Sequence, residues 1–318
     1  MHRSLRACVT SEVPRTHAAN MSIPIDSILR RLAAFTDHPS GGNPAGVWVG
    51  DMLPTPADML RIAADVGYSE TAFAAPAGDD RWAVRYYSPE AEVSFCGHAT
   101  IALGVVLGQL RGPGSYRLDT AAGEVAVDAG EHDGRAEAAL TSVEPRHRPV
   151  PDALLMGSLS TLGWSRDQLD PSLPPALAYA GAWHLVLAVA AKRTLDELAY
   201  DFAGLKAIML EEGLTTLQLV WREAPDLFHA RDPFPVGGVV EDPATGAAAA
   251  ALGGYLRGAE LLEAPASILI RQGEVMGRPS LVRVDIPEHG GIVVRGSAVP
   301  IEEPTDSSDV SAPAPPSR

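Results

Sequence analysis

The sequence has very few lysines and a large excess of acidic residues. Lys192 and Lys206 are the only lysines in 318 residues, and 40 Asp and Glu outnumber 25 Lys and Arg, which gives a formal net charge of −15. Proteins that bind nucleic acids carry a basic patch that attracts the phosphate groups. The composition therefore predicts no nucleic-acid partner.

Cysteines and long apolar runs are also scarce. Cys8 and Cys96 are the only cysteines, which is too few for a disulfide framework and typical of a reducing compartment. We therefore expect a cytoplasmic protein. No stretch reaches the roughly 18 consecutive apolar residues that a membrane-spanning helix needs, so no contact with a membrane is predicted.

The chain is long enough for two folded units. Its hydrophobic content of 46% and charged content of 20% are those of an ordinary globular protein. Residues 1–21 contain several Arg, Ser and Thr without periodicity, so we expect a disordered extension rather than a targeting segment, with Met21 as an alternative start of translation. Residues 302–318 predict a disordered tail rich in Pro, Ser, Ala and acidic residues.

The stretch 94–110 (SFCGHATIALGVVLGQL) organises the chain. It predicts a helix that starts at the Cys96-Gly97 turn and is apolar on every side, so it cannot lie on a surface and must be surrounded by other elements. The first N–H groups of a helix lack intrahelical partners, and the positive end of its dipole lies beside them. The start of this helix is therefore suited to holding an anion.

The same pattern recurs further along the chain. Six residues match a second apolar stretch, 242–256, at one offset of 149 (246 − 97 = 149): Gly97, Ala99, Ala102, Leu103, Gly104 and Leu107 against Gly246, Ala248, Ala251, Leu252, Gly253 and Leu256. Gly-Glu-Val at 123–125 recurs at 273–275. We infer an internal duplication into two halves, with a ligand site between them at which both helix N-termini point.

Periodicity and turn residues predict the remaining elements. An N-terminal half is expected over 22–144 plus 288–301, and a C-terminal half over 145–287. Further helices are predicted at 55–67, 152–162 and 194–205. Strands are predicted at 28–36, 47–50, 116–129, 135–141, 217–221 and 291–298, with a buried strand after Gly181, a hairpin at 268–286, a loop at 37–46 and a crossover at 144–151.

Four polar side chains are candidates for chemistry, and each has a purely structural alternative. Asn43 either donates to a ligand carboxylate or only caps its loop. Glu70 enters an apolar strand, where a carboxylate is unusual, and either exchanges protons with a substrate or lies at the strand rim. His98, in the first helical turn, either binds an anion or carries a proton, or is structural. Asp242 either faces the ligand or caps the second helix.

Five motifs, in order, carry a resemblance to a known family: GGNPAGV (41–47), SETAF (69–73), FCGHAT (95–100), EDPATG (241–246) and QGEVMGRPS (272–280). Together they resemble the PhzF-like family of phenazine-biosynthesis isomerases over about residues 28–298. The resemblance implies an α/β (α+β) fold of the diaminopimelate-epimerase type, in which two pseudo-symmetric halves each wrap a curved mixed sheet around a central helix. It also implies a homodimer.

The resemblance implies the isomerisation of trans-2,3-dihydro-3-hydroxyanthranilate by a proton shift without metal or organic cofactor. Its motifs place the acid/base role on Glu70 and put His98 and Asp242 beside it as catalytic candidates. The substrate would be bound by Asn43 and by the two helix starts, with Gly97 at one and Gly246 and Ala247 at the other. Ala247 departs from the pattern, because Ser is frequent at this position in the family.

The leading hypothesis is therefore a cofactor-independent isomerase that catalyses a proton shift on a small, cyclic, carboxylate-bearing metabolite, with Glu70 as the general acid/base. An epimerase or racemase with two facing thiols is not available to this sequence, but a one-thiol variant remains an alternative if the helix lowers the pKa of Cys96. A non-catalytic small-molecule-binding protein is a second alternative. No metal site is predicted, because the spacing of Glu70, His98 and Asp242 matches no metal-ligand pattern.

Overall fold

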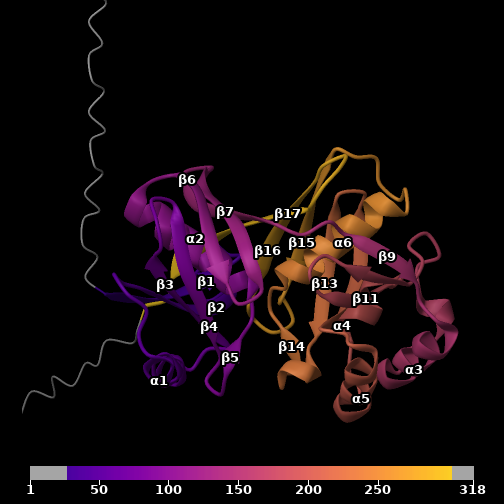
Figure 1. The fold of residues 1–318 in the computed structure, drawn as a ribbon. Helices are drawn as coiled ribbons and strands as arrows, with labels where there is room; N and C mark the ends of the chain where they lie inside the picture. The colour runs from indigo at the N-terminus through magenta and orange to yellow at the C-terminus, as the bar shows by residue number, and fades with distance from the viewer. Residues whose placement is uncertain (1–26, 303–318) are drawn as a thin grey trace, which may run out of the picture.

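The protein consists of two lobes that lie side by side (Figure 1). The computed structural model describes residues 27–302, so the predicted extension 1–21 and nearly all of the predicted tail 302–318 lie outside the described residues. Each lobe has one central helix surrounded by strands, with shorter helices on the outside. Among residues 27–302, no helix has the length and apolar character needed to cross a membrane.

In the first lobe, strands surround α2 (Gly97–Arg111), which contacts β1, β2, β3, β7, β8 and β17. Helix α1 (Pro56–Val66) packs outside, against β3 and β4. The strands are β1 (Ile28–Ala34), β2 (Asn43–Val49), β3 (Glu70–Pro76), β4 (Arg81–Tyr87), β5 (Glu92–Val93), β6 (Gly114–Thr120), β7 (Gly123–His132), β8 (Arg135–Thr141) and β17 (Val293–Pro300).

The second lobe repeats this plan around α6 (Gly246–Gly258), which contacts β9 to β12, β16 and β17. Its outer helices are α3 (Asp152–Leu162), α4 (Lys192–Asp196) and α5 (Phe202–Glu212), with 3-10 turns at Arg166–Gln168 and Pro235–Gly237. The strands are β9 (Arg146–Pro149), β10 (Ala176–Tyr179), β11 (Trp183–Ala188), β12 (Thr216–Ala224), β13 (Leu227–Pro233), β14 (Glu241–Asp242), β15 (Ala266–Gln272) and β16 (Ser280–Ile286).

Strand pairing reproduces the duplication that the 149-residue offset predicts. The parallel pairs β2–β3 and β4–β6 of the first lobe correspond to β11–β12 and β13–β15 of the second. The short strands β5 and β14, which lead into the central helices, are also antiparallel partners of equivalent strands, β4 and β13. Both lobes are therefore mixed sheets with one topology.

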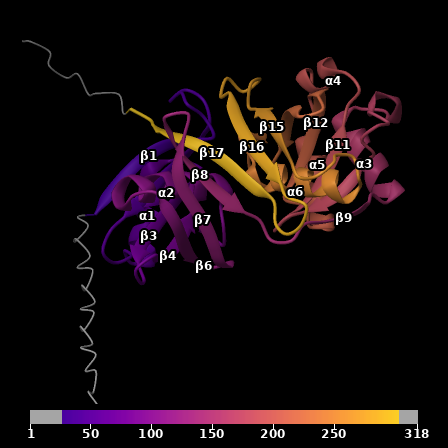
Figure 2. The same ribbon diagram turned by 90° about the horizontal axis from the view of Figure 1, so that it is seen from above.

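Strand β17 joins the two lobes. It pairs with β1 and β8 of the first lobe and with β16 of the second, and Figure 2 shows it running across the first lobe toward β16. The chain thus returns to its first half, as the sequence predicts for 291–298. Because β17 belongs to both sheets, the lobes share a hydrogen-bonded ladder.

Small residues let the strands approach the central helix of the first lobe. Residues 98–107 of α2 are all buried. A Cβ on Gly104 would lie only 2.6 Å from a methyl of Val127 and 2.7 Å from Ala138 Cβ, which is closer than carbon atoms approach in ordinary packing. The sheet can wrap α2 at this distance only because position 104 has no side chain.

Two predicted elements are each divided into two in the structure, so both predictions are wrong. The predicted strand 116–129 is the two strands β6 and β7, which turn at Ala121 and Ala122; Gly123, with φ of 115°, follows that turn. Alternation of polar and apolar residues continues through so short a turn, so it does not reveal the reversal. The predicted helix 194–205 is likewise two helices, because the Asp201 carboxylate accepts from Gly204 N–H and starts α5 anew.

Two predicted irregular segments contain strands. In the predicted loop 37–46, β2 already begins at Asn43. Pro44 is tolerated there because pairing with β3 starts only at Ala45, so its missing N–H removes nothing from that ladder. The predicted crossover 144–151 contains β9, which pairs with β10. The helix predicted at 152–162 is confirmed, as is that at 55–67, which is capped by Thr55 and Gly67.

We predict that Gly104→Val destabilises the protein by about 2 kcal/mol or more, because overpacking a filled core costs on the order of 1–3 kcal/mol. Urea unfolding of the two proteins measures the difference. Gly130→Val, in strand β7, is the matched control: a Cβ there meets nothing within 4 Å, so the expected change is within about 0.5 kcal/mol. Equal losses in the two variants would contradict this account of the packing.

Candidate active site

The candidate residues come from both lobes and meet where the two central helices begin. Asn43 is the first residue of β2, and Glu70 is the first of β3. His98 lies in the first turn of α2, while Asp242 ends β14, just before α6. The duplication thus brings equivalent ends of the two lobes together, and four polar side chains gather there.

Asn43 connects the lobes. Its Nδ2 lies 2.7 Å from Asp242 Oδ1 and 3.1 Å from the carbonyl oxygen of Ala244, both in the second lobe. The same nitrogen is 3.1 Å from His98 Nδ1 in the first lobe. Asn43 is 2% exposed, so these contacts are shielded from water. The interpretation of Asn43 as a cap of its own loop is therefore insufficient.

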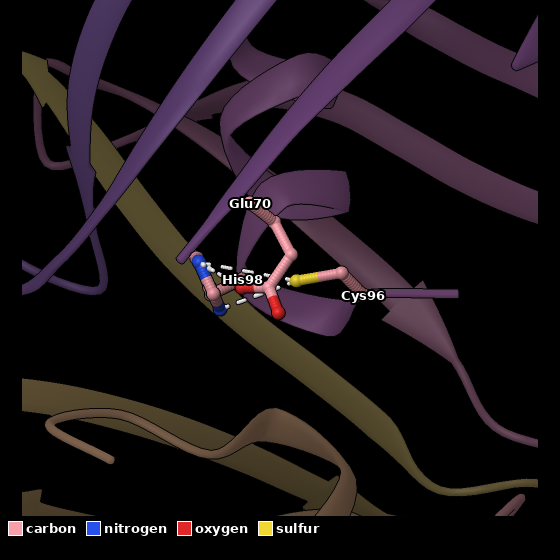
Figure 3. Close-up of side chains that lie close together, drawn as sticks. All are labelled: Glu70, Cys96 and His98. Atoms are coloured by element: carbon pink, nitrogen blue, oxygen red, sulfur yellow. Dashed lines mark hydrogen bonds and ion pairs between the residues drawn. The ribbon is translucent and has the colours of Figure 1, made fainter. Parts of the chain in front are cut away.

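His98 and Glu70 face one another. His98 Nε2 lies 3.5 Å from Glu70 Oε2, and the His98 side chain is 7% exposed whereas that of Glu70 is 18% exposed. Figure 3 shows both side chains pointing at a common centre, together with Cys96. Glu70 is thus the better exposed of the pair and the one that a bound molecule can reach.

Cys96 packs into the same cluster. Its Sγ lies 3.3 Å from His98 Nδ1 and 3.8 Å from His98 Nε2. Burial raises the pKa of the Cys96 thiol well above its usual value, and the negative charge of Glu70 raises it further. The alternative in which the helix lowers this pKa is therefore not supported, because desolvation outweighs the helix dipole and favours the protonated thiol.

Asp242 is held by side chains rather than by the helix it precedes. Thr245 Oγ1 donates to its Oδ2 at 2.6 Å, and Asn43 donates to its Oδ1. The N-cap residue of α6 is Thr245, and the helix has no side-chain capping bond, so the helix-cap interpretation of Asp242 is wrong. Burial raises the pKa of the Asp242 carboxyl, which favours its neutral form.

The two helix starts lie close to one another. A Cβ on Gly97 would be 3.9 Å from the backbone nitrogen of Ala247. Gly246 is buried, whereas Gly97 and Ala247 are partly exposed. The positive ends of both helix dipoles therefore act on one small region, which is where the sequence places a ligand site.

Sequence reasoning gave no role to Gln272 or Arg278, although both lie in the fifth motif. Gln272 is 1% exposed; its Nε2 donates to Asp242 O at 2.7 Å, and its Oε1 accepts from Thr245 N at 3.2 Å. Arg278 donates to Gly42 O at 2.7 Å and to Gly41 O at 2.6 Å. One segment thus fixes the residues around Asp242 in its own lobe and the loop before Asn43 in the other.

A second buried carboxyl lies behind Asp242. Asp232, opposite Asp242 in the β13–β14 pair, is fully buried, and the Gln218 amide lies 2.8 and 3.0 Å from its two oxygens. Burial raises the pKa of Asp232 well above its usual value, and the charges of Asp242 and Glu241 add to the effect. Burial therefore favours the neutral form of Asp232.

A hollow of about 270 Å³ lies outside this cluster, along β15, β16 and β17. Its lining mixes arginines with acidic side chains, and it includes none of Asn43, Glu70, His98 and Asp242. Its size alone does not make it the candidate site, because the polar side chains that contact one another lie at the helix starts.

Solved structures of other proteins share this two-lobed fold. A PhzF-family protein of Bacillus anthracis has a TM-score of 0.76, with 23% identity over 87% of this chain and 98% of that one. A probable proline racemase of Agrobacterium radiobacter has a TM-score of 0.58 and 14% identity, over 89% of this chain and 94% of that one. The predicted diaminopimelate-epimerase-like fold is thus confirmed.

The sequence assigns the chain to one family of proteins with this fold. The model of the PhzC-PhzF family, the phenazine biosynthesis-like proteins, matches residues 32–304, so the chain belongs to that family. An uncharacterized isomerase of Deinococcus radiodurans is 34% identical over 81% of this chain and 86% of its own length. The trans-2,3-dihydro-3-hydroxyanthranilate isomerase of Pseudomonas fluorescens is 28% identical over 84% and 98%. The predicted enzyme class, isomerase, is confirmed.

Removal of the Arg278 side-chain contacts should loosen the joint between the lobes. We predict that Arg278→Met lowers the free energy of unfolding by about 2 kcal/mol, since hydrogen bonds to charged donors contribute roughly 1.5–3 kcal/mol. Thermal unfolding measures the loss. Arg61→Met, on the exposed face of α1, is the control and should change stability by less than about 0.5 kcal/mol. An unchanged Arg278→Met protein would contradict the role of this contact.

Asp232→Asn tests the neutral buried acid. The folded-state pKa of Asp232 is raised above that of the unfolded chain, so its contribution to stability is present below about pH 4 and is lost as pH rises toward the folded-state pKa. The variant cannot ionise, and its stability advantage over wild type should grow by up to about 1.4 kcal/mol per pH unit in that range.

Urea unfolding at pH 5 and at pH 8 measures this advantage, which should be larger at pH 8. Asp226→Asn, on an exposed turn, is the control and should give the same difference from wild type at both values. An Asp232→Asn advantage that does not change with pH would show that Asp232 is ionised in the folded protein.

Proposed function

We propose that this isomerase moves a proton within a small, cyclic, carboxylate-bearing metabolite, with Glu70 as the general acid/base and without a cofactor. The observation that carries the proposal is the placement of Glu70. It is the partly exposed carboxylate beside buried His98, at the point where two helix N-termini meet. A base with this exposure can reach a substrate while the groups behind it stay fixed.

The proton shift proceeds in two transfers. Glu70 takes a proton from a carbon next to an activating group, and the electron pair of the broken C–H bond delocalises into that group. The N–H groups and dipoles at Gly97 and Gly246 stabilise the negative charge that develops, as in an oxyanion hole. Glu70 then returns the proton to a different carbon, so the composition of the substrate does not change.

His98 and Asp242 support these two proton transfers. His98 holds the Glu70 carboxylate through Nε2, while Asn43 lies against Nδ1 and sets the plane of the ring. The raised pKa of Asp242 lets it donate a proton to a substrate heteroatom in the first transfer and take that proton back in the second. Gly97, Gly246 and Ala247 bind the substrate carboxylate, which the positive helix ends attract, and Asn43 holds Asp242 and His98 beside it.

Membership of the family supports the substrate class that we propose, but it does not identify the compound. The Pseudomonas fluorescens relative is named for trans-2,3-dihydro-3-hydroxyanthranilate, and similarity over most of both chains supports a related cyclic acid here. Ala247 stands where the family often has Ser, and it lacks the hydroxyl that could bind a substrate group. We therefore propose a related substrate rather than that compound itself.

A racemase reaction is the second candidate, favoured by the likeness to the proline racemase fold. It would need a thiol to accept a proton, whereas Cys96 has a raised pKa and is the one cysteine within residues 27–302. A carboxylate mechanism therefore fits this cluster better. Cys96→Ser separates the two: it should keep proton exchange within about two-fold if Glu70 is the base, and lose it by about 10²-fold or more if the thiol is.

Proton NMR in deuterated water tests the proposal. The purified protein is incubated with cyclic amino and hydroxy acids, including trans-2,3-dihydro-3-hydroxyanthranilate, and deuterium incorporation is followed at each carbon. Glu70→Gln should lower the exchange rate by about 10²–10⁴-fold, because it removes the acid/base group. Glu90→Gln, on an exposed turn, should leave the rate unchanged.

Exchange that persists in Glu70→Gln would rule out Glu70 as the base. Binding of these acids without exchange in wild type would instead favour a non-catalytic binding protein. The cytoplasmic location and the homodimer are further predictions; light scattering coupled to size-exclusion chromatography measures the latter, and a mass near 33.4 kDa would contradict it.

A further inference from the structure

The Thr245 side chain does not cap the helix that it precedes. Thr245 is the N-cap residue of α6, where a threonine hydroxyl usually accepts a bond from an N–H group of the first turn, yet α6 has no side-chain capping bond. Its Oγ1 instead lies 2.6 Å from Asp242 Oδ2 and 3.0 Å from Gln272 Nε2. A side-chain hydrogen bond also joins it to Asp232. Because Thr245 is 9% exposed, these three bonds are made inside the protein.

The hydrogens of this cluster can be counted. A hydroxyl has one hydrogen to donate and two lone pairs that accept. Thr245 donates its hydrogen to Asp242, and one of its lone pairs accepts from Gln272, whose amide nitrogen can only donate. The remaining lone pair faces Asp232, so the hydrogen of that bond comes from Asp232. A carboxyl group supplies a hydrogen only in its protonated form.

We propose that Asp232, Thr245 and Asp242 form a proton relay, in which the proton of Asp232 replaces the one that Asp242 gives to the substrate. The relay rests on the proposed function, in which Asp242 is the proton donor. As Asp242 gives up its proton, the Thr245 hydrogen moves to Asp242 Oδ2 and the Asp232 hydrogen moves to Thr245 Oγ1. Three O–H bonds break, three form, and the negative charge ends on Asp232. The second transfer reverses each step.

The surroundings of Asp232 suit a charge that is present during only part of the cycle. The Gln218 amide lies 2.8 and 3.0 Å from the two carboxyl oxygens, so its NH₂ group can donate to both after the proton has left. Burial and the charges of Asp242 and Glu241 raise the pKa of Asp232, which favours return of the proton. Asp232 and Thr245 act through Asp242 and are therefore positioning residues.

Infrared spectroscopy tests the hydrogen-bond chain without any substrate. Protein with isotope-labelled aspartate carboxyl groups should show, at neutral pH, the C=O band of a protonated carboxyl, which a carboxylate lacks. Asp232→Asn should weaken this band. Thr245→Val should shift it to higher frequency, because the Asp232 O–H loses its acceptor, and Thr245→Ser should return it to the wild-type position. No such band in wild type, or a band that Thr245→Val leaves in place, would overturn the proposal.

Proton exchange in deuterated water tests the relay itself. Asparagine at position 232 can still donate a hydrogen bond to Thr245, but it cannot give up a proton. Asp232→Asn and Thr245→Val should therefore each lower kcat by about 10-fold or more and change KM by less than about two-fold. Thr245→Ser should restore kcat to within about three-fold of wild type. Because both residues serve one path, the double variant should be no slower than the slower single one; losses that multiply would overturn the relay.

Thr216→Val is the matched control, because it removes another buried threonine hydroxyl of the second lobe. Thr216 is 1% exposed, and its Oγ1 lies 2.8 Å from His184 Nδ1. This variant should lose stability, as Thr245→Val does, but keep the wild-type exchange rate. An equal loss of rate in both variants would show a structural effect and overturn the relay. No exchange by wild type with any acid would contradict the proposed function instead, and the infrared spectra would still decide whether the chain exists.

Discussion

The structure depends on the burial of two helices that have no polar face. Helices α2 and α6 are buried along most of their length, and a helix that is apolar on all sides must be enclosed. Each sheet therefore curves around its helix, and glycine at positions such as 104 sets the distance. The curved sheet leaves the N-terminus of the central helix at one end of each lobe. The first residues of β2 and β3 and the last residue of β14 lie at the same ends. The polar cluster is a consequence of how the apolar residues are packed.

Polar contacts that are shielded from water hold these ends of the two lobes together. Asn43, Gln272 and Arg278 supply them: Asn43 and Arg278 cross between the lobes, and Gln272 fixes the start of α6. A buried donor without an acceptor would cost about 1–3 kcal/mol, so each of these bonds also disfavours other arrangements of the lobes. Strand β17 adds a continuous ladder to the same joint. The relative position of Glu70 and Asp242 therefore follows from several independent constraints.

Much of this architecture could be predicted from the sequence, because the decisive signals are local or repeated. The unbroken apolar run of α2 predicted its burial, and one constant offset predicted the second lobe. The alternation of polar and apolar residues did not reveal the reversal between β6 and β7, because the alternating pattern continues through a two-residue turn. For the site, motifs singled out Asn43, Glu70, His98 and Asp242, but the contacts of Cys96, Gln272 and Arg278 are made with residues distant in sequence. A periodic sequence pattern carries no information about such contacts, because the contacting residues come together only in the folded chain.

The electrostatics of the cluster support the role that we propose for Glu70. Burial raises the pKa of the Asp232 and Asp242 carboxyls and of the Cys96 thiol, which favours the neutral form of each group. Each group that stays neutral removes one negative charge from the surroundings of Glu70. Glu70 thus faces His98 and two positive helix ends rather than further negative charge, although the whole chain carries a net charge of −15.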